Sequence, residues 1–166
     1  MNAILSGQRP DGAQRFIVYD EDLFHASKHA EAIRGGGFDP GKRNPVLLGF
    51  SAVAERYSHC YDGLFNDKSK VVRFRLHGQV WDVSDDETSQ LQALMGHSAD
   101  PVWNALVKKV ALAVGLDWNV NDHEARVRFA EAVRVSLLHH GIAGVQLGAE
   151  TQVVDIGAII IQEAKP

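Results

Sequence analysis

Three separated groups of residues in this 166-residue chain carry side chains that could do chemistry. The first is the step His25-Ala26-Ser27, the second is Phe50-Ser51 with Tyr57 behind it, and the third is Glu150. An imidazole, a hydroxyl and a carboxylate can hydrogen-bond a ligand and take part in acid–base or electrostatic catalysis. The residue types therefore permit a binding or catalytic site, provided that the fold brings the three groups together.

Each of these residues also has an ordinary structural interpretation. His25 is typical of a histidine satisfied at the end of a strand, and Phe50 lies in an apolar run that is typical of a core. Tyr57 would pack on a helix, and Glu150 would be a solvated hairpin carboxylate. The order and spacing of the groups, with Gly144 six residues before Glu150, favour the functional interpretation over these separate ones.

With these motifs, the sequence resembles the ADP-ribosyltransferase fold of the His-Tyr-Glu type. That family shows a His-Gly-Thr/Ser step, a Tyr-Phe-Ser/Thr step, and a Gly-x-x-Gly-Val turn shortly before a catalytic Glu. The resemblance covers most of residues 15–85 and 141–161 and leaves a helical insert at about 86–140. Small phage or bacterial mono-ADP-ribosyltransferases, including anti-CRISPR transferases, are similar in size and layout. The matching segments are Leu23-Phe24-His25-Ala26-Ser27, Leu48-Gly49-Phe50-Ser51 and Gly141-Ile142-Ala143-Gly144-Val145.

The resemblance implies a role for each matching residue. Glu150 would stabilise the cation beside the ribose 2′-hydroxyl, and His25 would hold the nicotinamide ribose of NAD. The backbone of Ala26 would meet the carboxamide, and Phe50 would lie near the nicotinamide. The other cofactor-binding candidates are Ser27, Ser51, Tyr57 and, for the pyrophosphate, Arg34.

Three positions depart from the family pattern. Ala26 stands where Gly is usual, and Gly49 stands where the stacking Tyr is expected, which leaves Phe50 or Tyr57 as its substitute. Gly148 lies two residues before Glu150, so the Glu-x-Glu signature of arginine-modifying relatives is absent. The resemblance therefore implies an acceptor other than arginine.

Eight histidines suggest a metal site, but their spacing does not support one. His25 and His29 are four residues apart, whereas His139 and His140 are adjacent and would point apart on a helix. No His-Glu-x-x-His run exists, and the single Cys60 cannot build a thiolate site. We expect no metal centre, and we expect Cys60 to be structural rather than nucleophilic.

The glycine run Gly35-Gly36-Gly37 lacks the pattern of a dinucleotide or phosphate loop. It is expected to be a flexible connector, with a mobile cover over a ligand as the alternative. A basic cluster at Lys68, Lys70, Arg73 and Arg75 is typical of a guarded strand edge, with a phosphate-handling role as the alternative.

Composition limits the class of protein. The 45% hydrophobic and 23% charged fractions are those of a globular chain, and the net charge of −4 argues against a large nucleic-acid face. No apolar stretch approaches the roughly 20 residues that cross a bilayer, and residues 1–10 lack a signal-peptide core. A lone cysteine fits a reducing compartment. We therefore expect a cytoplasmic protein, in the host cytoplasm if it is phage-encoded.

Periodicity predicts the elements that must position these residues. Strands are expected at 15–19, 23–27, 46–50, 70–83, 144–147 and 153–161, and short helices at 28–34 and, after a Ser51 cap, at 52–57. Two longer helices follow caps at Asp100 and Asp122 and end at Gly115 and Gly141. The pattern predicts an α+β class.

The sequence thus predicts one domain over residues 1–166, an α+β, ADP-ribosyltransferase-like split β-sandwich with a helical insert. The resemblance implies a mono-ADP-ribosyltransferase that uses NAD as co-substrate and modifies a macromolecule, with protein as the expected acceptor. The alternative is a non-catalytic protein-binding module that uses the acidic second half. Residues 84–166 hold 11 of the 21 acidic residues but 6 of the 17 basic ones. The oligomeric state is not predicted.

Overall fold

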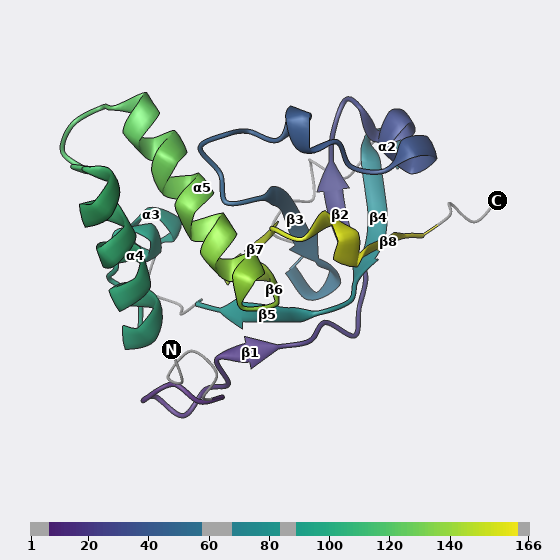
Figure 1. The fold of residues 1–166 in the computed structure, drawn as a ribbon. Helices are drawn as coiled ribbons and strands as arrows, with labels where there is room; N and C mark the ends of the chain where they lie inside the picture. The colour runs from purple at the N-terminus through teal and green to yellow at the C-terminus, as the bar shows by residue number, and fades with distance from the viewer. Residues whose placement is uncertain (1–6, 58–67, 84–88, 163–166) are drawn as a thin grey trace.

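A computed structural model describes residues 7–57, 68–83 and 89–162, which form an α+β protein built on one mixed eight-stranded sheet. The strand order is β1-β5-β6-β7-β3-β2-β4-β8, and every pair is antiparallel except β5 with β6. Figure 1 shows the strand direction turning strongly between β5 and β4. The strands are β1 (Phe16–Ile17), β2 (Leu23–Ala26), β3 (Phe50–Ala54), β4 (Val71–Leu76), β5 (Gln79–Asp82), β6 (Ile142–Leu147), β7 (Glu150–Val153) and β8 (Ile159–Ile161).

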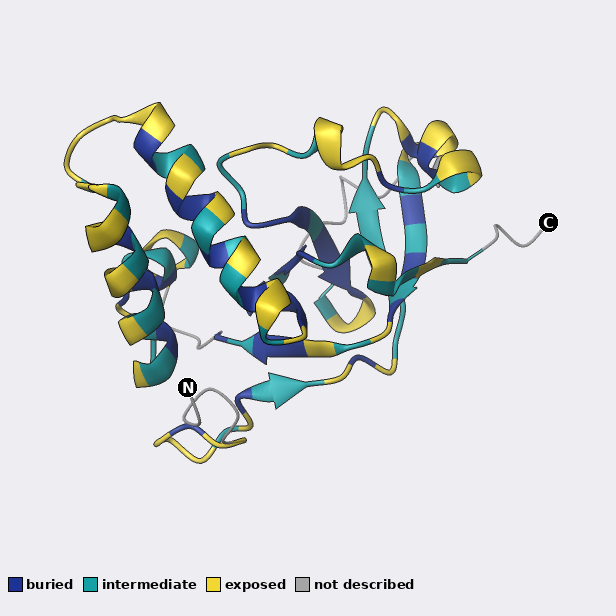
Figure 2. Ribbon diagram, viewed as in Figure 1, coloured by how far each residue is buried: buried dark blue, intermediate teal, exposed yellow. Residues whose placement is uncertain are grey.

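The two faces of this sheet bury two separate hydrophobic clusters. Successive side chains of a strand point to opposite faces, so neighbouring residues join different clusters. Trp81, Val145 and Leu147 belong to the helix-side face, which packs against the longer helices. Leu23 and Phe50 belong to the opposite face, called here the α2-side face. Figure 2 shows the buried residues of the helices turned inward and the exposed ones turned to solvent.

Three helices form the helix-side layer: α3 (Gln90–Leu94), α4 (Pro101–Val114) and α5 (His123–His139). In sequence, all three helices come between β5 and β6, which are neighbouring parallel strands of the sheet. A parallel pair needs such a crossover, of about a dozen residues or more. The predicted bounds are confirmed: Asp100 and Asp122 cap α4 and α5, and Gly115 ends α4 at φ 71°. None of the described helices is long and apolar enough to span a membrane.

The opposite face is covered by α2 (Ala30–Gly36) and the 3-10 turn η1 (Pro40–Lys42). Ala30, Ile33 and Phe38 are buried there against the sheet. The predicted helix at 28–34 is confirmed in outline, but it begins at Ala30 and continues through Gly35 and Gly36, two residues beyond the predicted end. Gly37, at φ 84°, then ends it, in a conformation that glycine adopts without steric cost.

The helix predicted at 52–57 is wrong, and so is the Ser51 cap. Residues 50–54 form β3, which pairs with β2 on one edge and with β7 on the other. Ala52 and Ala54 are 2% and 0% exposed, so they fill the core of the sheet. Pairing on both edges and burial override the helical preference of alanine, as tertiary context commonly does.

The long strand predicted at 153–161 is broken into two. β7 ends at Val153, and the chain then turns through η4 (Ile156–Ala158) before β8 begins at Ile159. Asp155 accepts a hydrogen bond from the Gly157 amide at 3.0 Å, which stabilises the turn. Asx turns of this kind compete with regular strand pairing, and apolar content alone does not reveal them.

Candidate functional site

A cavity of about 430 Å³ lies at the end of β2, between α2, the η1 segment and the start of β3. Its volume is within the range of small-molecule sites in proteins, about 300 to 1,000 Å³. Both of the first two predicted motifs contribute to its wall. The predicted site residues that line it are His25, Ala26, Ser27, Phe50 and Ser51.

His25 is held in a defined orientation at this wall. Its Nδ1 lies 2.5 Å from the carbonyl oxygen of Ser51 on the neighbouring strand. Burial lowers the pKa of His25 below 6.5, although the hydrogen bond to Ser51 acts in the opposite direction. The ring is therefore neutral at pH 7, with the proton on Nδ1 and an acceptor lone pair on Nε2. A sugar hydroxyl is a suitable donor to that atom.

Aromatic rings surround His25. Its ring meets Phe38 edge-on at 5.2 Å and Phe50 at 5.9 Å between centroids. Phe38 also packs on Phe50 at 4.8 Å and on Phe74 at 5.6 Å. Of these rings, Phe50 and His25 line the cavity, so Phe50 offers apolar contact to a flat heterocycle while the imidazole provides a polar contact. Phe38 was not predicted as a site residue, since nothing in its local sequence distinguishes it from an ordinary core phenylalanine.

Two of the predicted binding residues do not line this cavity. Arg34 donates to the backbone oxygens of Ser69 at 3.1 Å and Val71 at 2.8 Å, so it ties α2 to the start of β4. Tyr57 packs against the α2-side cluster, and the Arg56 guanidinium lies 5.8 Å from its ring centroid. Both side chains are thus placed in structural contacts instead of at the cavity.

Glu150 lies outside the cavity, on the other face of the sheet. It pairs with Leu147 on β6 and with Val53 on β3, three residues along from Phe50. Cross-strand partners share a face, and Leu147 belongs to the helix-side cluster. Accordingly, the Glu150 carboxylate accepts a hydrogen bond of 2.6 Å from Gln90 on α3. The structure does not bring Glu150 together with His25.

The backbone around Gly49 explains why glycine stands at this position. A Cβ at this position would overlap the backbone carbonyl oxygen of Val153 on β7. Only glycine permits β3 and β7 to approach this closely, so no aromatic residue could stand here. The adjacent Phe50 is the ring that reaches the cavity.

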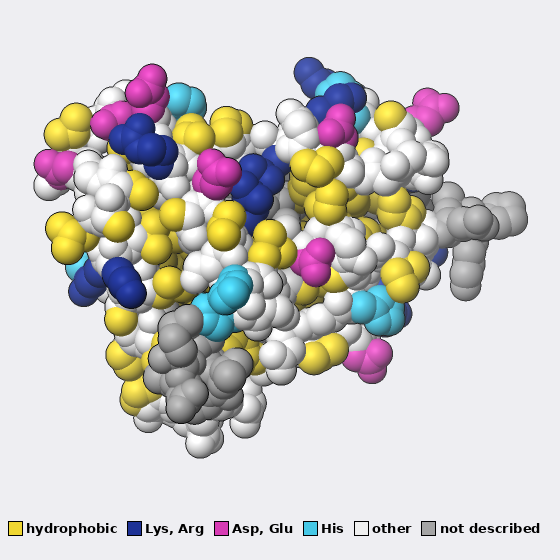
Figure 3. Space-filling view, in the orientation of Figure 1, with side chains coloured by type: hydrophobic (Ala, Val, Ile, Leu, Met, Phe, Trp, Pro, Cys, Tyr) yellow, Lys and Arg dark blue, Asp and Glu magenta, His cyan; other side chains and the backbone are white. Residues whose placement is uncertain are grey.

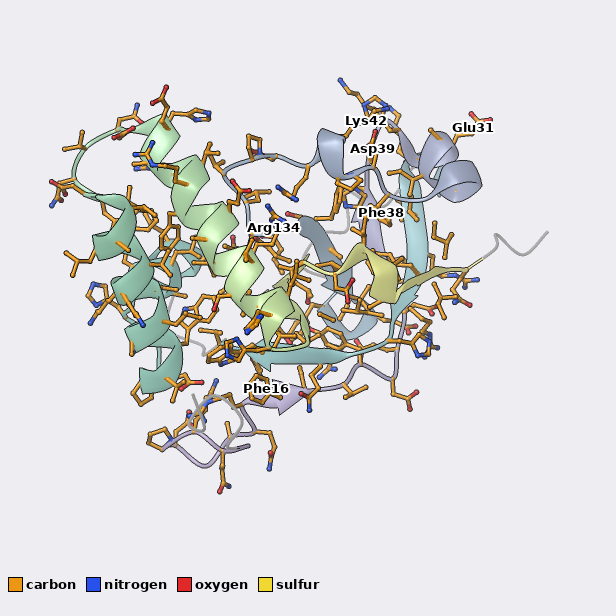
Figure 4. The ribbon with its side chains drawn as sticks, viewed as in Figure 1. Phe16, Glu31, Phe38, Asp39, Lys42 and Arg134 are labelled. Carbon is orange, nitrogen blue, oxygen red and sulfur yellow. The ribbon has the colours of Figure 1, made fainter. Side chains whose placement is uncertain are left out.

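Polar residues that were not predicted complete the rim. Lys42 and Asn44 come from the η1 segment, and His29 comes from the turn before α2. Asp39 is the one acidic residue among the described residues of the lining, and it accepts a hydrogen bond from the Gly41 amide at 2.9 Å. Figure 4 shows Asp39 and Lys42 on the η1 side of the site, with Phe38 beneath them and Glu31 turned away. Gly36, the last residue of α2, and its C-cap Gly37 also line the cavity, so the first two glycines of the run are helical and do not form a flexible connector.

The other predicted features resolve into structural roles or lie outside the described residues. Arg73 and Arg75 form ion pairs with Asp22 at 3.6 Å and 2.6 Å, so part of the basic cluster is neutralised locally. No group of three metal-ligating side chains occurs in the described part of the chain. Cys60 falls in the segment 58–67, which is not described.

Comparison of this chain with protein-family models, with curated proteins and with solved structures gave no match. The functional inference therefore depends on the geometry of the cavity and on the two motifs that line it.

Proposed function

We propose that the cavity binds the nicotinamide-ribose end of NAD and that the protein is a mono-ADP-ribosyltransferase acting in the cytoplasm. The fold assigned by this proposal is ADP-ribosyltransferase-like, with the α3–α5 crossover as its insert. The acceptor class is a macromolecule, with protein as the first choice. The observation that carries the proposal is the meeting of the His25-Ala26-Ser27 and Phe50-Ser51 motifs in one cavity.

The chemistry of the wall supports this ligand. The Nε2 lone pair of a neutral His25 accepts from a ribose hydroxyl, and the ring of Phe50 offers apolar contact to the nicotinamide. Ser27 uses its Oγ to accept the His29 amide at 3.0 Å, which leaves its hydroxyl proton available to a ligand. Lys42 supplies positive charge at the rim for a phosphate.

In the proposed reaction, the bond between the ribose C1′ and the pyridinium nitrogen breaks, and nicotinamide leaves as a neutral molecule with the bonding electron pair. An oxocarbenium-like ribose results, and the nucleophile of the acceptor forms the new bond at C1′ as its proton passes to a base. The cation needs a carboxylate nearby. Since Glu150 is on the other face, we assign this role to Asp39, the acidic residue of the described lining.

The position of Glu150 also favours a second candidate function. Glu150, the expected catalytic glutamate, accepts a hydrogen bond from Gln90 away from the cavity. A protein with this arrangement would bind a nucleotide without transferring ADP-ribose from it. This candidate is a nucleotide-binding protein without transferase activity, and it differs from the protein-binding module that the sequence left as the alternative. It predicts saturable NAD binding and no release of nicotinamide.

The test combines calorimetric titration of NAD with an assay of nicotinamide release in the presence of host protein extract. We expect wild-type protein to bind NAD and His25→Ala to weaken that binding about tenfold or more, because a hydrogen bond to a buried site is lost. Binding without nicotinamide release would support the second candidate. Absence of NAD binding would contradict both.

Carboxylate variants identify the group that acts on the cation. Asp39→Asn is expected to lower the rate of nicotinamide release about a hundredfold or more, as for other electrostatic groups at a reacting centre. Glu31→Gln, an exposed carboxylate of α2, is the matched control, and Glu150→Gln tests the sequence prediction directly. Loss of release in Glu150→Gln, with Asp39→Asn unaffected, would return the catalytic role to Glu150.

A further inference from the structure

A second, smaller cavity of about 180 Å³ shares Phe50 as a lining residue with the first. The η1 end, the turn after β7 and the C-terminal half of α5 form its wall. Two arginines from distant parts of the chain, Arg43 and Arg134, line this space together with Asp155. Figure 3 shows basic side chains gathered in the hollow between the α5 side and the α2 side, and Figure 4 labels Arg134 there.

These two guanidinium groups have unused hydrogen-bonding capacity. The Nε atoms of Arg43 and Arg134 are both buried, and neither has a hydrogen-bond partner. Within the described ranges, Arg43 makes no ion pair, and Arg134 has only a 3.8 Å contact with Glu131, whose side chain is 65% exposed. A buried donor without a protein partner costs free energy, so an acceptor that reaches these two atoms would stabilise the protein.

The charges of the cavity favour an anion. Burial and the neighbouring charge of Arg134 lower the pKa of Arg43, and the charge of Glu131 acts in the opposite direction. Arginine keeps its proton at neutral pH. The carboxylate of Asp155 accepts a hydrogen bond from the Gly157 amide at 3.0 Å. Among the described residues, Asp155 forms no ion pair with either arginine. Among the described residues, the counter-charge that the two arginines share is Glu131, whose side chain is 65% exposed, so an anion bound between the two arginines would be stabilised further.

We propose that Arg43 and Arg134 form a binding site for a phosphate group, next to the cavity assigned above to NAD. The planar guanidinium fork matches the oxygens of a phosphate, and two forks, one from each arginine, would hold one such group with charge-assisted hydrogen bonds. Phe50 borders both cavities, so a phosphate here belongs either to a ligand that passes from the first cavity or to a separate phosphorylated molecule. The site does not depend on the proposed NAD chemistry.

Inorganic phosphate is the probe for this site. The protein is dialysed into chloride buffer and titrated with sodium phosphate at constant ionic strength, with binding followed by calorimetry and by thermal melting. We expect a saturable rise in Tm with phosphate that sodium chloride does not reproduce. Absence of a saturable response to phosphate, AMP and ADP-ribose alike would overturn the proposal.

Variants connect that response to the two arginines. Arg43→Gln and Arg134→Gln should each weaken phosphate binding about tenfold or more, as expected for the loss of charge-assisted hydrogen bonds. Arg128→Gln removes the same charge from an exposed position of α5 and should change the affinity less than about twofold. Equal weakening in all three would show a general charge effect and overturn the site.

Folding and binding are separated by a second measurement. Since each variant relieves repulsion between like charges, Arg43→Gln should melt no lower than wild type in phosphate-free buffer. Should that variant not fold, Arg43→Lys keeps the charge and tests the fork geometry, with weaker phosphate binding expected. Unchanged phosphate affinity in a folded Arg43→Gln or Arg43→Lys would contradict the proposal.

Competition identifies the source of the phosphate. If phosphate and ADP-ribose exclude one another, and both lose affinity in Arg134→Gln, the group belongs to the nucleotide that occupies the first cavity. If they bind together, the site takes a separate phosphorylated ligand. Phosphate binding in a protein that fails to bind NAD would refute the proposed function and leave the phosphate site in place.

Discussion

At the scale of single residues, the burial of one imidazole decides what the cavity can accept. His25 commits its Nδ1 to the Ser51 carbonyl, so the ring presents an acceptor only while it is neutral. Protonation would turn Nε2 into a donor and place a positive charge among the rings of Phe38 and Phe50. The polarity of this wall is therefore linked to pH.

The pH dependence of ligand binding follows from the lowered pKa of His25. We expect the affinity for NAD to be constant from pH 8 down to the ordinary imidazole pKa of 6.5, and to fall only at lower pH as the buried ring takes up a proton. Calorimetric titration between pH 5 and pH 8 measures this. A loss of affinity that begins above pH 7 would contradict it.

The lowered pKa of His25 should also make the free energy of unfolding depend on pH. The folded-state pKa of His25 lies below that of the unfolded chain, so the unfolded state binds the proton first as pH falls. The contribution of neutral His25 is thus fully present above pH 6.5 and is lost below it. Urea unfolding at pH 5 and pH 8 should show a smaller pH effect in His25→Gln than in wild type.

At the scale of elements, the close approach of β3 and β7 places Phe50 at the cavity. The approach depends on Gly49, whose missing Cβ leaves room for the Val153 carbonyl oxygen. We expect Gly49→Ala to lower the free energy of unfolding by about 1–3 kcal/mol or more, the usual range for overpacking in a rigid core.

The matched control for that prediction is Gly35→Ala in α2. No atom lies within 4 Å of a Cβ added at Gly35, so this change should raise stability by about 0.5–1 kcal/mol through the gain in helix propensity. Urea denaturation of both variants measures the contrast. Equal stability of the two alanine variants would show that β3 and β7 can separate without cost.

The elements also show how far the sequence alone could predict the structure. Local signals were sufficient for α4 and α5, because the caps Asp100 and Asp122 mark where each begins. They were insufficient for β3, whose alanines favour a helix until β2 and β7 pair with both of its edges.

Some residues of the candidate site could likewise be predicted from local sequence, and others could not. His25 and Phe50 could be predicted because each lies within a short motif, and β2 and β3 then bring the two motifs to one cavity. Glu150 could not be placed, since one residue of register decides which face of a strand a side chain occupies. Arg43 and Arg134 come from distant segments, and no local pattern connects them.

At the scale of the whole molecule, one buried ion pair joins the N-terminal segment, the sheet and the helical layer. Asp100 is 0% exposed, accepts from the Arg15 Nε at 2.8 Å and also from the Trp81 Nε1 at 2.8 Å. It caps α4 as well, by accepting the Val102 amide at 3.0 Å. Burial alone would raise the pKa of Asp100, but these hydrogen bonds hold it below its ordinary value.

Removing that carboxylate should therefore destabilise the whole fold instead of one helix end. Asp100→Ala leaves the Arg15 guanidinium, 3% exposed, without its counter-charge, and should lower the free energy of unfolding by about 3–5 kcal/mol. Asp122→Ala removes a cap of the same type from an exposed position of α5 and should cost about 1 kcal/mol. Urea unfolding of the two variants isolates the buried network, since both lose one helix cap. Similar losses would mean that Asp100 acts as a helix cap alone, and that Arg15 and Trp81 find other partners when it is removed.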